Sequence, residues 1–158
     1  MGIPNFCRGD VNAIPAPFTT GSVFALGEVC ALVSNKAIPA SAFTWDTDLA
    51  TTRTNFVAAL LGVSLQQHLS TTSGSVYGNG TDNRIMLGTT GEYWFAVSGT
   101  AAAFGDWVCL AKNPSSNALL PATVEKVTTE ATAIGRCVEV VSASLVIVRL
   151  KQVVIPGV

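Results

Sequence analysis

Short stretches of alternating hydrophobic and polar residues, separated by Gly, Asn, Ser and Thr, run through the chain from residue 21 onward. This period of two, with many β-branched residues, predicts strands that bury one face. One expected strand pair covers 84–89 and 92–97, and Thr90 and Gly91 between them have the length of a hairpin turn. The residues expected on its buried faces are Ile85, Leu87, Tyr93, Phe95 and Val97.

A second hairpin is expected near the end of the chain, where 136–141 and 145–151 flank a small polar turn. In its last strand Val146, Val148 and Leu150 alternate with more polar positions, the pattern of a half-buried strand.

Helical signals are confined to one place. Asp46, Thr47 and Asp48 precede 49–55, and their side-chain oxygens are suited to accept hydrogen bonds from the first turn of a short helix.

The first twenty residues have a different pattern. Pro4, Pro15 and Pro17 are separated by small and polar residues, and proline resists both helices and central strands. We therefore expect an extended N-terminal arm over 1–20 and a β domain over 21–158. The large apolar residues of the arm, which are its expected anchors on a partner, are Ile3, Phe6 and Phe18.

An internal repeat relates the two halves of the chain. Residues 26–32 match 104–110 in character, as an apolar residue, a glycine, an acid and a strand. Residues 61–65 match 134–138 in the same way, and the offsets of 78 and 73 differ only by loop length. Glycine supplies the positive φ that tight turns need. We expect equivalent turns and strand starts at Gly27 and Gly105 and at Gly62 and Gly135, in two similar halves that pack into one barrel or sandwich.

Charge and hydropathy narrow the function classes. The 158 residues include only 12% charged residues and 49% hydrophobic ones, with a net charge of −1. Without clustered Lys and Arg, binding to nucleic acid is not expected, and no apolar run is long enough for a membrane-spanning helix. Burial against protein partners explains the apolar composition best, so we expect a homo-oligomer.

Candidate chemistry is sparse. The single His68 is expected at the surface or in a hydrogen bond, and no nucleophile motif or phosphate loop accompanies it. The four cysteines lack metal-ligand spacing and are expected to be reduced, and three of them lie within apolar stretches. We therefore expect no enzyme activity, cofactor or metal.

The ordered motifs nevertheless resemble a known family. Residues 104–108 read FGDWV, 133–139 read AIGRCVE and 145–150 read LVIVRL. In this order, and with similar segments at 42–48 and 60–64, they resemble the small decoration, or cement, proteins of tailed-bacteriophage capsids.

The resemblance implies a compact β-barrel or β-tulip fold without catalytic residues. It further implies a trimer that is made in the host cytoplasm and becomes part of the virion. There it would bind the outside of an icosahedral head across neighbouring major capsid subunits and resist internal DNA pressure.

Tryptophans are the remaining candidates for an interface. Trp94 alternates with Tyr93 and Phe95, so it faces outward if those residues face the core. Trp is common at binding hot spots. A different function, a β-sandwich module that binds carbohydrate or another ligand, would use Trp45 or Trp94 as a stacking platform.

Overall fold

Strands dominate the part of the chain that the computed structural model describes, residues 9–68 and 83–151. The strands are β1 (Ala13–Pro17), β2 (Val29–Val33), β3 (Lys36–Pro39), β4 (Leu60–Ser64), β5 (Arg84–Gly88), β6 (Glu92–Val97), β7 (Trp107–Lys112), β8 (Leu119–Val127), β9 (Gly135–Ser142) and β10 (Leu145–Leu150). They are joined by one α-helix, α1 (Leu49–Ala58), and two 3₁₀ turns, η1 (Ala40–Ala42) and η2 (Glu130–Thr132). The expectation of a compact all-β fold is confirmed.

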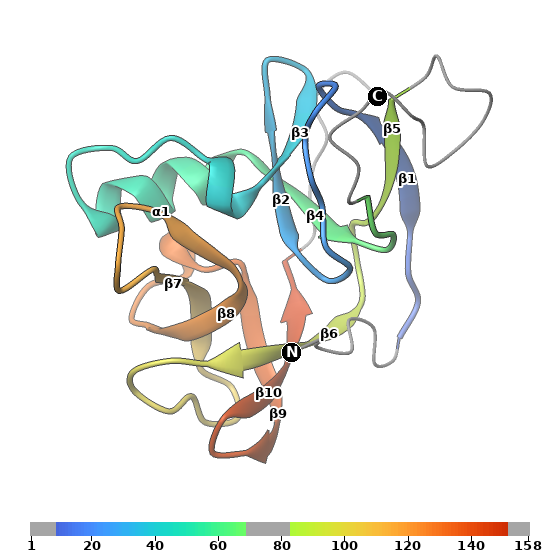
Figure 1. Ribbon diagram of the computed structural model, residues 1–158. Coiled ribbons are helices and arrows are strands. Elements are labelled where there is room, and N and C mark those ends of the chain that lie inside the picture. Colours follow the sequence, from blue (N-terminus) through green and yellow to red (C-terminus); the bar gives the residue numbers. More distant parts are fainter. Residues whose placement is uncertain (1–8, 69–82, 152–158) are drawn as a thin grey trace.

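The strands form two sheets that have the same strand order. The first half makes a five-stranded sheet in the order β1-β5-β4-β2-β3, and the second makes a closed barrel in the order β6-β10-β9-β7-β8. In Figure 1 the blue to green sheet lies above the yellow to red barrel, and α1 lies beside β7 and β8. Each half thus builds its own sheet, so the expectation that they join in one barrel or sandwich is wrong.

The register of the strand pairs matches between the halves as well as their order. In the first half Val29 lies opposite Val63 and Cys30 opposite Gly62. At the corresponding positions of the second half, Trp107 lies opposite Arg136 and Val108 opposite Gly135. These are the repeat positions that the sequence brings together.

The closing contact of the barrel also has a counterpart. β6 and β8 close the barrel as a parallel pair, with Val97 opposite Val124. In the first half the corresponding contact is a single parallel bridge between Phe18 and Ala37. The first sheet therefore has the strand order of the barrel, but its two edges meet only at this bridge and it is not a closed barrel.

The prediction of an extended N-terminal arm is wrong for residues 13–18. Residues 13–17 form β1, which pairs with β5 at the edge of the first sheet, and Phe18 is only 3% exposed. Proline is tolerated in an edge strand because its missing N–H need not pair. Ile14, Ala16 and Phe18 face the smaller core cluster, so Phe18 is a core residue and not a free anchor.

The prediction that 84–89 and 92–97 form a hairpin is also wrong. Both strands are present, and Ile85, Leu87, Tyr93 and Phe95 are buried. However, β5 pairs with β1 and β4, whereas β6 pairs with β10 and β8. The short segment between β5 and β6 connects the two sheets. It has the length of a hairpin turn, but the strands that it joins do not pair with each other. The second hairpin, β9 with β10, is confirmed.

The short helix is confirmed at the expected place. The Asp48 carboxylate caps α1 by accepting a hydrogen bond of 2.8 Å from the backbone N–H of Thr51. Two residues before Asp48, the backbone N–H of Asp46 donates a hydrogen bond to the hydroxyl of Thr52 in the helix. Capping fixes where α1 begins, and this places Arg53 and Phe56 on its buried side.

His68 is buried, not at the surface, and its hydrogen bond is confirmed. Its side chain is 5% exposed, its Nδ1 lies 2.9 Å from the carbonyl oxygen of Ser22, and its ring packs on Phe18. We expect His68→Ala to destabilise the chain by about 1–3 kcal/mol, because it removes a buried ring and a hydrogen bond. Chemical denaturation with an unchanged midpoint would contradict this.

Candidate partner-binding surface

The predicted interface residues do not gather at one place. Ile3 and Phe6 lie outside the described residues, and Phe18 is in the core. Trp45 is half-buried against the main core, with the Lys112 ammonium 5.3 Å from its ring centroid. Trp94 is also half-buried, and its indole N–H is buried without a hydrogen-bond partner. Neither tryptophan offers the fully exposed ring that a carbohydrate platform would use.

Metal-ligating side chains are dispersed over the described segments. Within residues 9–68 and 83–151, no three His, Cys, Asp or Glu side chains gather as a metal site. None of the helices there is long and apolar enough to cross a membrane.

The two glycine–acid turns have the same geometry. Gly27 has φ of 84° and Gly105 has φ of 87°, which favours glycine in both turns. Their N–H groups each donate a 2.8 Å hydrogen bond, to the carbonyl oxygens of Ser64 and Cys137 respectively. The two turns are therefore equivalent features of the two halves.

The acid that follows each glycine ties its turn together. Glu28 accepts from the N–H of Ala25 at 3.0 Å, and Asp106 accepts from the N–H of Ala103 at 2.8 Å. Burial raises the pKa of Glu28, whereas the hydrogen bond from Ala103 and the nearby Lys126 lower the pKa of Asp106. The acid of the second turn, Asp106, is thus in a more solvent-exposed environment than Glu28 in the first.

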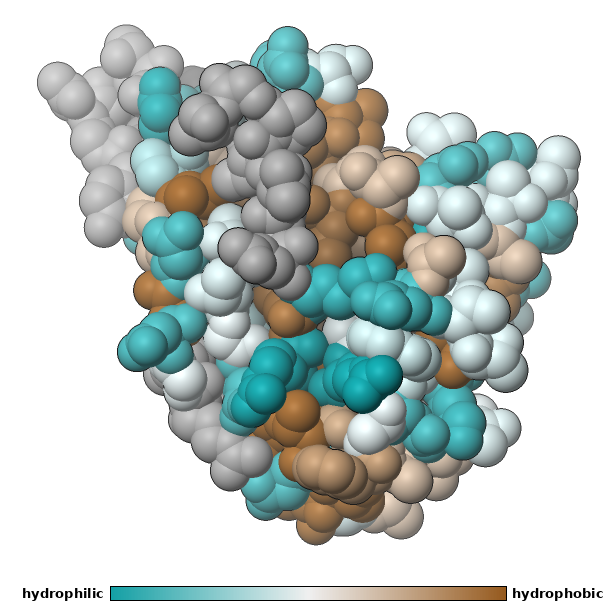
Figure 2. Space-filling view, turned by 180° about the vertical axis from the view of Figure 1, so that it is seen from behind, coloured by the Kyte–Doolittle hydropathy of each residue, from teal (hydrophilic) through white to brown (hydrophobic). Residues whose placement is uncertain are grey.

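Each turn presents a large apolar residue to solvent just before its glycine. Leu26 is 46% exposed and Phe104 is 79% exposed. Exposed apolar side chains on rigid turns are typical of protein contact sites. Further exposed apolar residues, Val140 and Val141, lie on β9. Figure 2 shows hydrophobic residues at the lower end of the molecule, where Figure 1 places the β9–β10 hairpin.

A cluster of cations surrounds Trp107 on the outside of the barrel. Trp107 lies opposite Arg136, and Arg136 lies opposite Arg149 on the next strand. The Arg136 guanidinium lies 4.0 Å from the Trp107 ring centroid, and the Lys151 ammonium lies 6.0 Å from it. We call Trp107, Arg136, Arg149 and Lys151 the Trp107 face.

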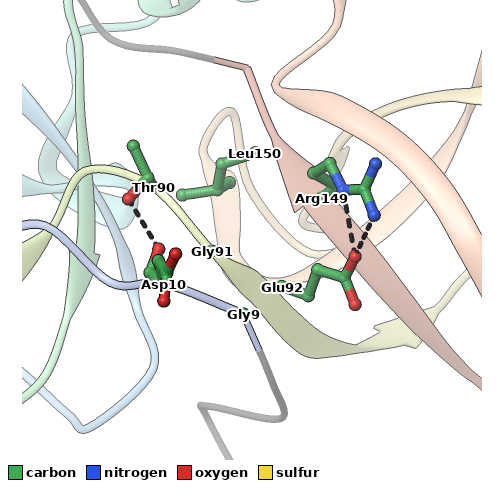
Figure 3. Close-up of a pocket in the computed structure, with 7 residues that line it drawn as sticks. All are labelled: Gly9, Asp10, Thr90, Gly91, Glu92, Arg149 and Leu150. Carbon is green, nitrogen blue, oxygen red and sulfur yellow. Dashed lines mark hydrogen bonds and ion pairs between the residues drawn. The ribbon is translucent and has the colours of Figure 1, made fainter.

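Two shallow pockets meet at the end of β10. One, of about 220 Å³, is lined by Trp107, Arg136, Val138, Arg149, Leu150 and Lys151. The other, shown in Figure 3, is lined by Gly9, Asp10, Thr90, Gly91, Glu92, Arg149 and Leu150. There the Thr90 hydroxyl donates to the carbonyl oxygen of Asp10, and Arg149 points toward Glu92, with its Nε 2.9 Å from Glu92 Oε1.

Sequence reasoning singled out Trp45 and Trp94 and missed Trp107. The signal was present in the repeat, because Trp107 and Arg136 stand where the first half has Val29 and Val63. An aromatic residue and a cation in the second half thus replace two valines of the first. This difference indicates that the two equivalent faces have different surroundings.

The described cysteines are buried free thiols. Burial raises the pKa of Cys30 and of Cys137, and it raises that of Cys109 to about 11. Since the thiolate is the reactive form, iodoacetamide at pH 8 should label Cys109 about a hundredfold more slowly in the native than in the unfolded chain. Peptide mass spectrometry scores each site, and equal labelling of native and unfolded Cys109 would contradict the prediction.

Comparisons of the chain with protein-family models, with curated proteins and with solved structures found no match.

Proposed function

We propose that this chain is a non-enzymatic decoration protein that binds the outer surface of an icosahedral phage capsid. The observation that carries the proposal is the assembly of the family-like segments into one unit. The turn at Gly105 and Asp106 bonds to Cys137 through both its N–H and its carbonyl groups, and β9 then pairs with β10. Segments that are separate in the sequence thus form one continuous structure, as a shared fold requires.

The surface of the chain supports a role in protein contact. The described residues hold no metal-ligand cluster, and their most exposed large apolar residue, Phe104, stands on a turn held by backbone hydrogen bonds. A rigid apolar residue loses little entropy on binding, so such a turn is suited to hold a partner.

Binding to shells tests the proposal. Expanded, DNA-free shells from the phage whose genome encodes the chain are mixed with the purified protein and examined by electron microscopy. We expect regular added density on the outer surface and a higher temperature of shell disruption, with unexpanded shells as the control. Expanded shells that remain undecorated at saturating protein would overturn the proposal.

The proposal includes self-association, with a trimer expected. Light scattering of the isolated protein at micromolar concentration checks this, because interfaces of specific assemblies bury about 800 Å² per partner and hold at such concentrations. A strict monomer would contradict the trimer.

A further inference from the structure

The duplication makes it possible to compare one face of the molecule with its own copy. In the first half the outer row across β2, β4 and β5 consists of Val29, Val63 and Gly88, which are all buried. A side chain at Gly88 would overlap with the hydroxyl of Tyr93 in the barrel, so this row is packed directly against the second half.

The corresponding row of the second half has no such cover. Its positions are Trp107, Arg136 and Arg149, which lie on the strands equivalent to β2, β4 and β5. Arg136 is exposed, the Arg149 side chain is 67% exposed and Trp107 is half-buried. One copy of this face is therefore an interface within the chain, whereas the other copy faces solvent.

We propose that the Trp107 face is an interface with the partner protein, where it binds an acidic, carboxylate-bearing patch. This inference rests on the proposed function, in which the partner is the capsid shell. The location follows from the duplication, and the chemistry of the partner follows from the charges that surround Trp107.

Those charges are mostly positive. The shallow pocket beside Trp107 has three cations and no acid among its lining residues. Two described carboxylates near this face already have cationic partners: Glu92 is 8% exposed and is bound to Arg149, and Asp106, which precedes Trp107 in the chain, is bound to Lys126. Arg136 and Lys151 thus remain to attract a partner's carboxylates, although the whole chain has a net charge of −1.

The geometry of Arg136 suits a carboxylate ligand. Its guanidinium lies over the Trp107 ring at 4.0 Å, which holds the flat group in place through a cation–π contact. A guanidinium held this way presents its N–H groups as a fork, and carboxylates bind this fork through two parallel hydrogen bonds. Trp107 would then be the apolar anchor beneath the ionic contact.

Charge reversal tests the inference. In sedimentation with expanded shells, we expect Arg136→Glu to weaken binding at least about tenfold, with only a small decrease in the thermal midpoint, because Arg136 is exposed and loses only its contact with Trp107. The matched control is Lys36→Glu, which makes the same charge change at the exposed first residue of β3 in the first half and should bind like the wild type. We also expect added salt to weaken the wild type more than Arg136→Glu.

The outcomes separate the two proposals. Wild-type binding with an unaffected Arg136→Glu variant would overturn the inference and leave the proposed function standing. Failure of the wild type to bind shells would overturn both. Binding of a fluorescent DNA duplex that is lost in Arg136→Glu would also overturn the inference, because the ligand would then be phosphate on nucleic acid.

Discussion

Arg53→Met is expected to destabilise the chain by about 2–4 kcal/mol, because removal of one partner leaves a buried polar network unpaired. Arg53 projects from α1, and its Nε and Nη2 donate to the carbonyl oxygen of Leu110 at 2.9 and 2.7 Å. It also forms an ion pair with Glu125 on β8. The side chain thus joins the helix of the first half to the barrel of the second.

The Leu110 carbonyl needs this partner for a local reason. The register between β7 and β8 shifts just after Leu110, so the regular ladder is interrupted there. Arg53 supplies two donors at this irregularity, and methionine keeps much of its length while removing them. Denaturant melts with an unchanged unfolding slope would show that stability alone has changed.

A surface ion pair provides the control. Lys126 lies 3.0 Å from Asp106, but its side chain is 41% exposed. Lys126→Met should therefore cost less than about 1 kcal/mol. Equal losses for Arg53→Met and Lys126→Met would contradict the buried network as the cause. The double variant Arg53→Met with Glu125→Gln should lose less than the sum of the two single losses, because the two side chains interact directly.

The repeat was the most informative part of the sequence for the fold. Matching Gly27 with Gly105, and Gly62 with Gly135, anticipated turns of nearly equal φ and strand pairs of matching register. The turn positions Gly27 and Gly105 are visible in the sequence because their positive φ itself favours glycine, whereas Gly135 is glycine because a neighbouring strand lies close to it.

Features that depend on tertiary pairing were not visible. β1 was hidden because Pro15 and Pro17 occupy its outward positions, and only the alternation of Ile14, Ala16 and Phe18 indicates a strand. The separation of β5 from β6 was hidden because a three-residue connection between sheets has the length of a hairpin loop. Local patterns do not reveal which strand becomes the partner.

The candidate surface was predicted even less completely. A sequence reports that a tryptophan is outward-facing in its strand, but not whether another element covers it. Trp45 and Trp94 are half-buried, whereas the cations around Trp107 come from β9 and from Lys151, near the end of the chain. Only the folded barrel brings these side chains together.

Gly135→Ala is expected to destabilise the chain by about 2–3 kcal/mol, because a methyl group there overlaps with backbone atoms that cannot move aside. An added Cβ would collide with the Arg149 carbonyl oxygen and lie 2.9 Å from Val148 Cγ1. Gly105→Ala is the control, since its φ of 87° is unfavourable for alanine but no atom lies within 4 Å, so about 1 kcal/mol is expected. Gly62→Ala extends the comparison to the first half, where the Cβ would lie 2.5 Å from the Gly88 carbonyl oxygen and φ is also positive at 154°, so its loss should be at least as large as that of Gly135→Ala. Thermal melts measure the losses of the three variants, and a loss at Gly105 as large as at Gly135 would contradict the steric overlap between β9 and β10 as the larger effect.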